Sequence, residues 1–199
     1  MTHFEVLESE LRKFEIDLPA PQKLALSQYC DELNRWNKKM NLTGLSGAEM
    51  VRRLVVEPVW IGLQLGLSGV LVDVGSGNGS PAIPLAVVSR FANAHLVEAR
   101  TKRAAFLRHV SSLLKLPGLT VHRGRFEEIA PALEKADWVT LQAMALTDQI
   151  IDSMSLISCT TTTVVWITSG APRTTLRSFR TFEVPLTNSK VFLFRLDQS

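Results

Sequence analysis

Val70-Leu71-Val72-Asp73-Val74-Gly75-Ser76-Gly77-Asn78-Gly79 is the stretch of sequence that decides the fold. Its first five residues form a short and almost uninterrupted apolar run, which is typical of a parallel strand buried on both faces. The glycines that follow allow a sharp backbone turn, and residues 82–88 suit a helix packed on a sheet. Such a turn lies at the carboxyl end of its strand, where open α/β sheets bind their ligands.

Further runs of strand length alternate with helical stretches downstream. Strands are expected over residues 94–98, 119–122, 138–141 and 161–167, and helices over residues 101–114 and 147–157. Two late runs, 182–185 and 191–194, predict an antiparallel pair. The expected fold class is therefore α/β, with a Rossmann-like, mostly parallel seven-stranded sheet. Residues 160–163 and 173–175 show little periodicity, so we expect one crossover helix to be reduced or absent.

The region before the first strand reads as helical. Apolar side chains recur at helical spacing between Pro21 and Lys39, and Pro21 suits the first turn of that helix. Ser46 followed by Glu49 predicts a capping box at the start of the next helix. We expect a helical N-terminal extension over residues 1–66 and a Rossmann-like domain over residues 67–199, together forming one compact unit.

Composition fits a globular protein with a proper core. Of the 199 residues, 46% are hydrophobic and 21% are charged, which are ordinary proportions for such a protein. No apolar run approaches the roughly 20 residues that span a bilayer, and the first residues lack a signal-peptide pattern. We therefore expect a cytoplasmic protein that does not enter a membrane. Cys30 and Cys159 are expected to be buried thiols, and the four histidines show no metal-ligand spacing, so no metal is expected.

The glycine turn favours S-adenosylmethionine (SAM) as its ligand. The dinucleotide fingerprint needs its third glycine one residue later, at Ser80. The loop also begins with the acid Asp73, which suits the sulfonium cation of SAM and is awkward beside a pyrophosphate. We predict that Asp73, Gly75, Gly77, Gly79 and Ser80 form the cofactor site. A dinucleotide loop, or a tight turn without a ligand, remains the alternative.

Two acidic positions extend this site. Glu98 ends the second strand, where a carboxylate can accept both ribose hydroxyls of an adenosine. Phe126 and Glu127, after the third strand, are predicted to flank the adenine. Glu98 could instead be a solvated strand-end acid, and Glu127 could simply favour the start of a helix.

Four segments together show a family resemblance. In chain order they are Trp36-Asn37-Lys38-Lys39-Met40-Asn41-Leu42-Thr43, residues 73–85, Lys102-Arg103-x-x-Phe106-Leu107-Arg108 and Arg123-Gly124-Arg125-Phe126-Glu127-Glu128. They resemble the glucose-inhibited division protein B (GidB) family, SAM-dependent bacterial methyltransferases that act on guanine N7 in 16S rRNA. The W-N-x-x-x-N-L-T segment is the most discriminating, since a generic methyltransferase would not carry it. The resemblance is good over roughly residues 20–145.

The resemblance implies a role for several positions. Gly75 and Ser80 would contact the donor, Glu98 would hold its ribose, and Phe126 and Glu127 would line the adenine. Asn41 would position groups at the mouth of the active site. Gln142 aligns with an arginine of the family, so it is assigned to both donor binding and positioning.

The departures from the family pattern lie on the acceptor side. The family's R-H-I-L-D-S becomes Arg53-Leu54-Val55-Val56-Glu57-Pro58, and its L-K-G lysine and late R-H pair become Ser169 and Ser189-Lys190. These changes leave two alternatives to the family's activity. One is a methyltransferase with another RNA or a small-molecule acceptor, and the other is an inactive relative that binds SAM or RNA.

Methyl transfer to guanine N7 needs no general base, because N7 has a free lone pair and no proton to lose. Catalysis would come from positioning and electrostatics. The implied partner is the small ribosomal subunit, and we expect a monomer. The candidate groups for RNA phosphates, chosen by charge, are Lys38, Lys39, Arg53, Lys102 and Arg103.

Overall fold

The computed structural model describes residues 2–170, 174 and 176–196 of the chain. Its centre is a seven-stranded sheet with the order β3-β2-β1-β4-β5-β7-β6. The strands are β1 (Ser68–Val74), β2 (Arg90–Glu98), β3 (Leu119–Arg123), β4 (Trp138–Gln142), β5 (Thr163–Thr168), β6 (Arg180–Glu183) and β7 (Lys190–Phe194). The first five run parallel, while β7 lies antiparallel to both β5 and β6. The expected fold class is confirmed, with the late antiparallel pair at one edge.

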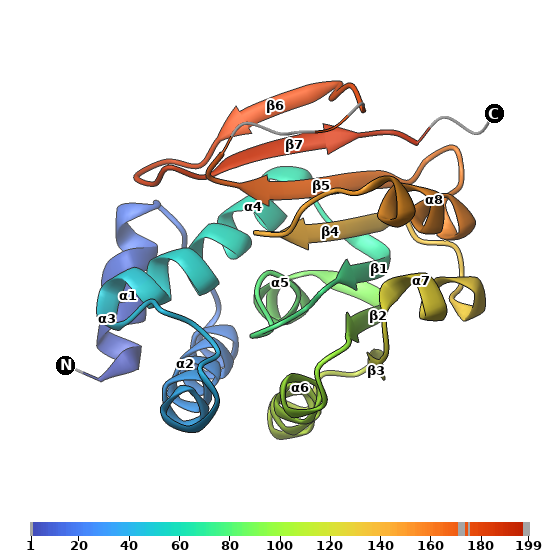
Figure 1. Cartoon of the computed structure of the whole chain (residues 1–199). Coiled ribbons are helices and arrows are strands. Elements are labelled where there is room, and N and C mark those ends of the chain that lie inside the picture. The colour runs from blue at the N-terminus through green and yellow to red at the C-terminus, as the bar shows by residue number, and fades with distance from the viewer. Residues whose placement is uncertain (1, 171–173, 175, 197–199) are drawn as a thin grey trace.

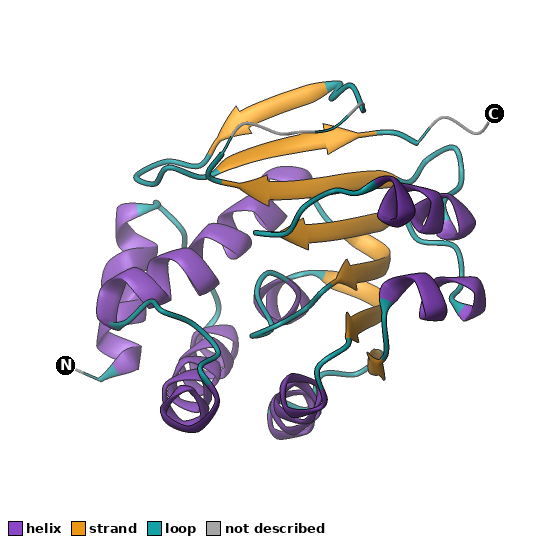
Figure 2. Cartoon of the chain, in the orientation of Figure 1, coloured by secondary structure: helices purple, strands orange, loops and turns teal. Residues whose placement is uncertain are grey.

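Helices cover both faces of the sheet (Figures 1 and 2). They are α1 (His3–Lys13), α2 (Ala20–Met40), α3 (Gly47–Val51), α4 (Glu57–Leu65), α5 (Ala82–Val88), α6 (Thr101–Leu113), α7 (Phe126–Ile129) and α8 (Asp148–Ile157), and the 3₁₀ turn Ala130–Ala132 follows α7. Helices α1 to α6 share one buried cluster with side chains such as Leu71 and Ile167. Helices α7 and α8 form the other cluster, against Val72 and Trp166. Strands β1, β2, β5 and β7 thus send alternate side chains into two separate cores, as a doubly covered sheet requires.

The N-terminal helices pack on the face of the sheet that β6 and β7 would otherwise leave uncovered. The described residues between β5 and β6 contain no helix. Trp60 of α4 packs on Phe182 of β6, with their ring centroids 6.0 Å apart. The prediction of a reduced or absent crossover helix agrees with the described part of this region, whereas residues 173 and 175, on which it also rested, lie outside the described residues. Helix α4 covers part of the face that a crossover helix would protect.

One π-helical turn, η1 (Arg52–Val56), joins α3 to α4. The amide of Glu57 donates to the carbonyl of Arg52, five residues back. Pro58 has no amide hydrogen, and its ring would clash with the carbonyl of Leu54 in a regular α-helix. The proline therefore explains why the ladder widens at this turn, a feature that is frequent at functional sites.

Some local predictions fail. Ser46 caps α3 by position, but its side chain makes no capping hydrogen bond, so the predicted box with Glu49 is wrong. A complete box instead starts α1, between Thr2 and Glu5. Cys30 is buried as expected, whereas Cys159 lies in a turn before β5 and is partly exposed. In the part of the chain that the structure describes, no helix could span a membrane.

Candidate functional site

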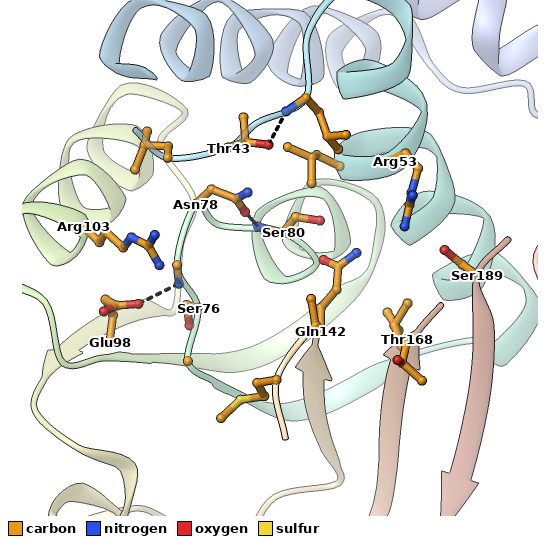
Figure 3. Close-up of a pocket in the computed structure, with 18 of the residues that line it drawn as sticks. Thr43, Arg53, Ser76, Asn78, Ser80, Glu98, Arg103, Gln142, Thr168 and Ser189 are labelled. Atoms are coloured by element: carbon orange, nitrogen blue, oxygen red, sulfur yellow. Dashed lines mark hydrogen bonds between the residues drawn. The ribbon is translucent and has the colours of Figure 1, made fainter. Parts of the chain in front are cut away.

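A cavity of about 510 Å³ opens at the carboxyl ends of β1, β2, β4 and β5. Figure 3 shows its two ends: Glu98 and Arg103 lie on one side of the glycine turn, and Gln142, Thr168, Ser189 and Arg53 lie on the other. The remaining lining residues are Leu42, Thr43, Leu45, Leu54, Gly75, Ser76, Gly77, Asn78, Ser80, Arg100, Ala143, Met144, Ile167 and Ser169. The cavity thus lies where an open α/β sheet binds its ligand, and its volume suits a small molecule.

The glycines of the turn differ in what they do. Gly75 and Gly77 have φ values of +70° and +54° and line the cavity. A Cβ atom on Gly75 would lie 3.1 Å from the sulfur of Met144, so the backbone and Met144 approach each other closely there. Glycine adopts such φ values at the lowest cost, and its lack of a side chain leaves the cavity open.

Gly79 serves the packing of the loop rather than the cavity. Its φ is +95°, and an added Cβ would lie 2.8 Å from Ile83 and 3.3 Å from both Leu107 and the hydroxyl of Tyr29. Tyr29 is fully buried in α2 and donates to the carbonyl of Asn78 at 3.0 Å. The structure therefore anchors this end of the loop onto α2, α5 and α6, and it places Gly79 outside the residues that line the cavity.

Glu98 braces the loop from the neighbouring strand. The side chain is 5% exposed, and its two oxygens accept from the amides of Gly77 at 2.9 Å and Arg100 at 2.7 Å. Each carboxylate oxygen has a further lone pair, so hydroxyl groups of a ligand can still donate to it. The prediction that Glu98 contacts a bound ribose is therefore compatible with this geometry.

Asp73 lies beneath the loop. It is 1% exposed, and one carboxylate oxygen accepts from the hydroxyl of Thr140 at 2.6 Å. The other oxygen, Oδ2, is buried without a hydrogen-bond partner among the described residues. Burial, as the largest cause, raises the pKa of Asp73 to about 7, although Thr140 and Ser76 oppose this. Asp73 does not line the cavity, so it acts on a ligand there only from below the loop.

The N-L-T turn forms another wall and depends on Asn37. The Asn37 side chain donates to the carbonyl of Thr43 and accepts from its amide, both at 2.9 Å. These two bonds close the turn after α2 and place Leu42 and Thr43 at the cavity. Asn41 ends α2 with a φ of +51°, is exposed, and lies beside the lining residues rather than among them.

The far end of the cavity contains a buried ionic group. Arg53 lines the cavity, and its Nε lies 3.3 Å from Oε1 of Glu57, which is 0% exposed. Ser189, directly before β7, donates to the other Glu57 oxygen at 2.7 Å. Burial is the largest cause that raises the pKa of Glu57, while Ser189 and Arg53 lower it.

The predicted site residues divide into two groups. Those that line the cavity are Gly75, Gly77, Ser80, Glu98, Gln142, Arg53 and Arg103. Those that do not are Asp73, Gly79, Asn41, Phe126, Glu127, Lys38, Lys39 and Lys102. Phe126 is buried in the core beneath α7, and the three lysines are exposed. Among the described residues, no cluster of three or more acids, histidines or cysteines could hold a metal ion.

Several groups that hold the site together could hardly be predicted from the sequence. Tyr29 appeared only as one apolar position on a helix, and Asn37 only as part of a motif. Asn78 accepts from the amide of Ser80 at 3.0 Å, an Asx turn that its place in the glycine stretch could have indicated. Thr140 carried no signal, and Ser189 stood out only as a departure from the family's late R-H pair, because the partners of both lie far away in the sequence.

Structural comparison supports the fold alone. A methyltransferase from Geobacter sulfurreducens matches with a TM-score of 0.61 at 12% identity, over 85% of this chain and 90% of that one. A structure described as MtNAS in complex with MTA and tNA matches with a TM-score of 0.58 at 16% identity, over 87% and 70%. Both confirm the Rossmann-like methyltransferase fold.

Sequence comparison identifies the family. The ribosomal RNA small subunit methyltransferase G of Cronobacter sakazakii is 39% identical over 142 residues, which are 68% of this chain and 65% of that protein. The protein of that name from Nitratidesulfovibrio vulgaris is 35% identical over 161 residues, 76% and 74% of the two chains. The family model described as GidB, rRNA small subunit methyltransferase G, matches residues 22–182. The resemblance drawn from the W-N-x-x-x-N-L-T segment and the glycine turn is thus confirmed, and the chain belongs to the GidB family.

Proposed function

We propose that this protein is a SAM-dependent methyltransferase that acts on a guanine N7 of 16S rRNA in the small ribosomal subunit. The observation that carries the proposal is one cavity with two different ends. At one end are the open glycine turn and Glu98, and at the other are Gln142, Ser189 and Arg53. Membership of the GidB family supplies the class of reaction and of acceptor.

The residues present fit SAM as the donor. The backbone at Gly75 and Gly77 leaves space that a Cβ would occupy, and Glu98 keeps acceptor capacity for ribose hydroxyls. The buried, unpartnered Oδ2 of Asp73 would supply negative charge below a cation when this carboxyl group is ionised. When bound, SAM supplies an electrophilic methyl group on a sulfonium cation. We retain Phe126 and Glu127 as the proposed adenine contacts, which requires the ligand to extend past Glu98 toward the start of α7.

The chain's own groups then have positioning tasks. Among the described residues that line the cavity, Glu98 is the only carboxylate, and no histidine, cysteine or lysine is present. Glu98 already accepts two backbone amides, which suits binding better than proton transfer. A lining without a free base fits an acceptor such as guanine N7, which loses no proton. Gln142, at the end of β4, lies between the two ends and could orient the base by hydrogen bonds.

Acceptor binding is assigned to the positive groups around the opening. Arg53 and Arg103 line the cavity, and Lys38, Lys39 and Lys102 are exposed on α2 and α6 nearby in the fold. Positive side chains that contact phosphates release counterions, so their contribution falls as salt rises. We also propose that the active form is a monomer.

Calorimetric titration with SAM, followed by transfer of a labelled methyl group to small subunits that lack the modification, tests the proposal. Glu98→Gln should weaken SAM binding about 10- to 100-fold, since hydrogen bonds to a charged group contribute about 1.5–3 kcal/mol. Glu183→Gln, which removes an exposed carboxylate on β6, is the matched control and should bind like the unmodified protein. Absence of SAM binding would refute the function, and SAM binding without transfer to the subunits would refute the acceptor.

A further inference from the structure

Glu57 is a fully buried acid whose surroundings do not satisfy it. Its exposed fraction is 0%, and Oε2 accepts the hydroxyl of Ser189 at 2.7 Å. Oε1 is 3.3 Å from Nε of Arg53, yet neither of these two atoms has a hydrogen bond of good geometry among the described residues. Proximity of opposite charges alone therefore holds Arg53 to Glu57.

Stability is a poor explanation for this group. Taking a carboxylate and a guanidinium out of water is costly, and well-packed apolar residues in such a place are often as stable. Two of the three members, Arg53 and Ser189, also line the cavity. A buried acid that contacts two groups of the site wall is thus placed to fix that wall rather than to hold the core together.

The π turn separates two neighbouring arginines. Arg52 points to α1, where its Nε donates to Oε2 of Glu10 at 2.7 Å. Arg53 points the other way, toward the cavity and Ser189 (Figure 3). The side chain of Arg53 is 33% exposed, and the described residues offer no hydrogen bond to its terminal nitrogens. Its planar fork therefore faces open space while its Nε edge faces Glu57.

Arg53 also borders a second hollow. This hollow has a volume of about 330 Å³ and lies between the π turn and the turn that precedes β7. Its lining residues are Glu49, Arg52, Arg53, Leu186, Thr187 and Asn188. Since Arg53 lines both hollows, a polynucleotide with one base in the cavity would pass Arg53 on its way to the second.

We infer that Glu57 is a positioning residue that holds Arg53 at the boundary of the two hollows, where its fork binds the phosphodiester joining the methylated nucleotide to its neighbour. A fork held in one orientation suits the bidentate contact that arginine makes with phosphate. Asn188, which is exposed in the turn before β7, adds a neutral polar group for that neighbouring nucleotide. The inference rests on the proposed function, because it takes RNA as the acceptor.

A double-mutant cycle tests it. The unmodified protein, Glu57→Gln, Arg53→Gln and the double variant are compared by methylation of unmodified small subunits and by binding to them with S-adenosylhomocysteine present. Glu57→Gln should raise the KM for subunits and the binding Kd about tenfold, with kcat and SAM affinity within about twofold. Arg53→Gln should do at least as much, and adding Glu57→Gln to it should have no further effect. Arg53→Lys, which keeps the charge and loses the fork, should also raise KM.

Glu32→Gln is the matched control, because Glu32 is a buried acid that pairs with Arg35 at 3.1 Å and with His109 at 2.8 Å, and none of these three residues lines either hollow. It should change the melting temperature and leave the KM for subunits unchanged. If Glu57→Gln does not fold, the double variant and Arg53→Lys test the inference in its place. The double variant buries no unpaired charge and should therefore fold.

The outcomes separate the inference from the proposed function. Two results overturn the inference alone, provided that the unmodified protein methylates subunits. One is a normal KM for subunits in Glu57→Gln. The other is a double variant in which the losses of subunit affinity caused by Glu57→Gln and Arg53→Gln add. Binding of subunits without methylation refutes the proposed activity, while the binding cycle still decides the role of Glu57. A protein that does not bind small subunits at all overturns the inference.

Discussion

Replacing the loop glycines by alanine should separate their roles. Gly79→Ala brings a Cβ to 2.8 Å from Ile83 at a φ of +95°. Backbone strain of about 1–3 kcal/mol and overpacking of about 1–3 kcal/mol add, so we expect a loss near 3 kcal/mol of unfolding free energy. For a domain of this size such a loss lowers the melting temperature by about 6–12 °C. Gly66→Ala, at a φ of +62° with no atom within 4 Å, should lose only about 1 kcal/mol.

The assay pairs urea unfolding with SAM titration on the same three variants. Gly77 lines the cavity, and a Cβ added there would have no contact closer than 3.5 Å. Gly77→Ala should therefore reduce SAM affinity more than it reduces the free energy of unfolding. Gly79→Ala should do the reverse. If Gly79→Ala is as stable as Gly66→Ala but binds SAM poorly, this division of roles is refuted. Gly79 would then be a ligand contact.

Three further predictions concern titration and the N-L-T turn. Because burial raises the pKa of Asp73 to about 7, its folded form binds more protons than its unfolded form between pH 4 and 7, so its contribution to stability falls as pH rises. The unfolding free energy of Asp73→Asn minus that of the unmodified protein should therefore be more favourable to the variant at pH 8 than at pH 5. Urea unfolding at the two pH values measures this difference. Hydrogen bonds, chiefly from Thr161, lower the pKa of Cys159 to about 7, so iodoacetamide at pH 7.5 should label it and spare the buried second cysteine, as peptide mass spectrometry would show. Asn37→Ala removes both bonds to Thr43 and should cost about 1–3 kcal/mol in urea unfolding.

The donor end of the site was largely predictable because its residues are local. Gly75, Gly77 and Ser80 follow one strand directly, and Glu98 ends the next, so the order of elements alone brings them together. Within this stretch, sequence could not separate Gly79 from the other glycines. Its role depends on Tyr29 and Leu107, which come from two other helices.

The adenine prediction had a weaker basis. Phe126 was expected beside a ligand because it follows the third strand, yet its ring is 5% exposed in the core under α7. An apolar residue at the start of a short helix has to face either the ligand or the core. Spacing cannot choose between these, since the choice depends on how the helix lies against the sheet.

At the acceptor end, the positions of charged residues in the sequence do not predict which side chain faces the cavity. Arg52 and Arg53 are adjacent and carry the same side chain, so charge alone cannot show which of them faces the cavity. The π turn set by Pro58 sends one to Glu10, 42 residues earlier, and the other to the cavity beside Ser189. Ser189 in turn reaches Glu57 across 132 residues. A substitution at Pro58 that restored a regular helix would rotate both arginines at once. Pro58 and the buried Glu57 therefore act together to position the guanidinium of Arg53.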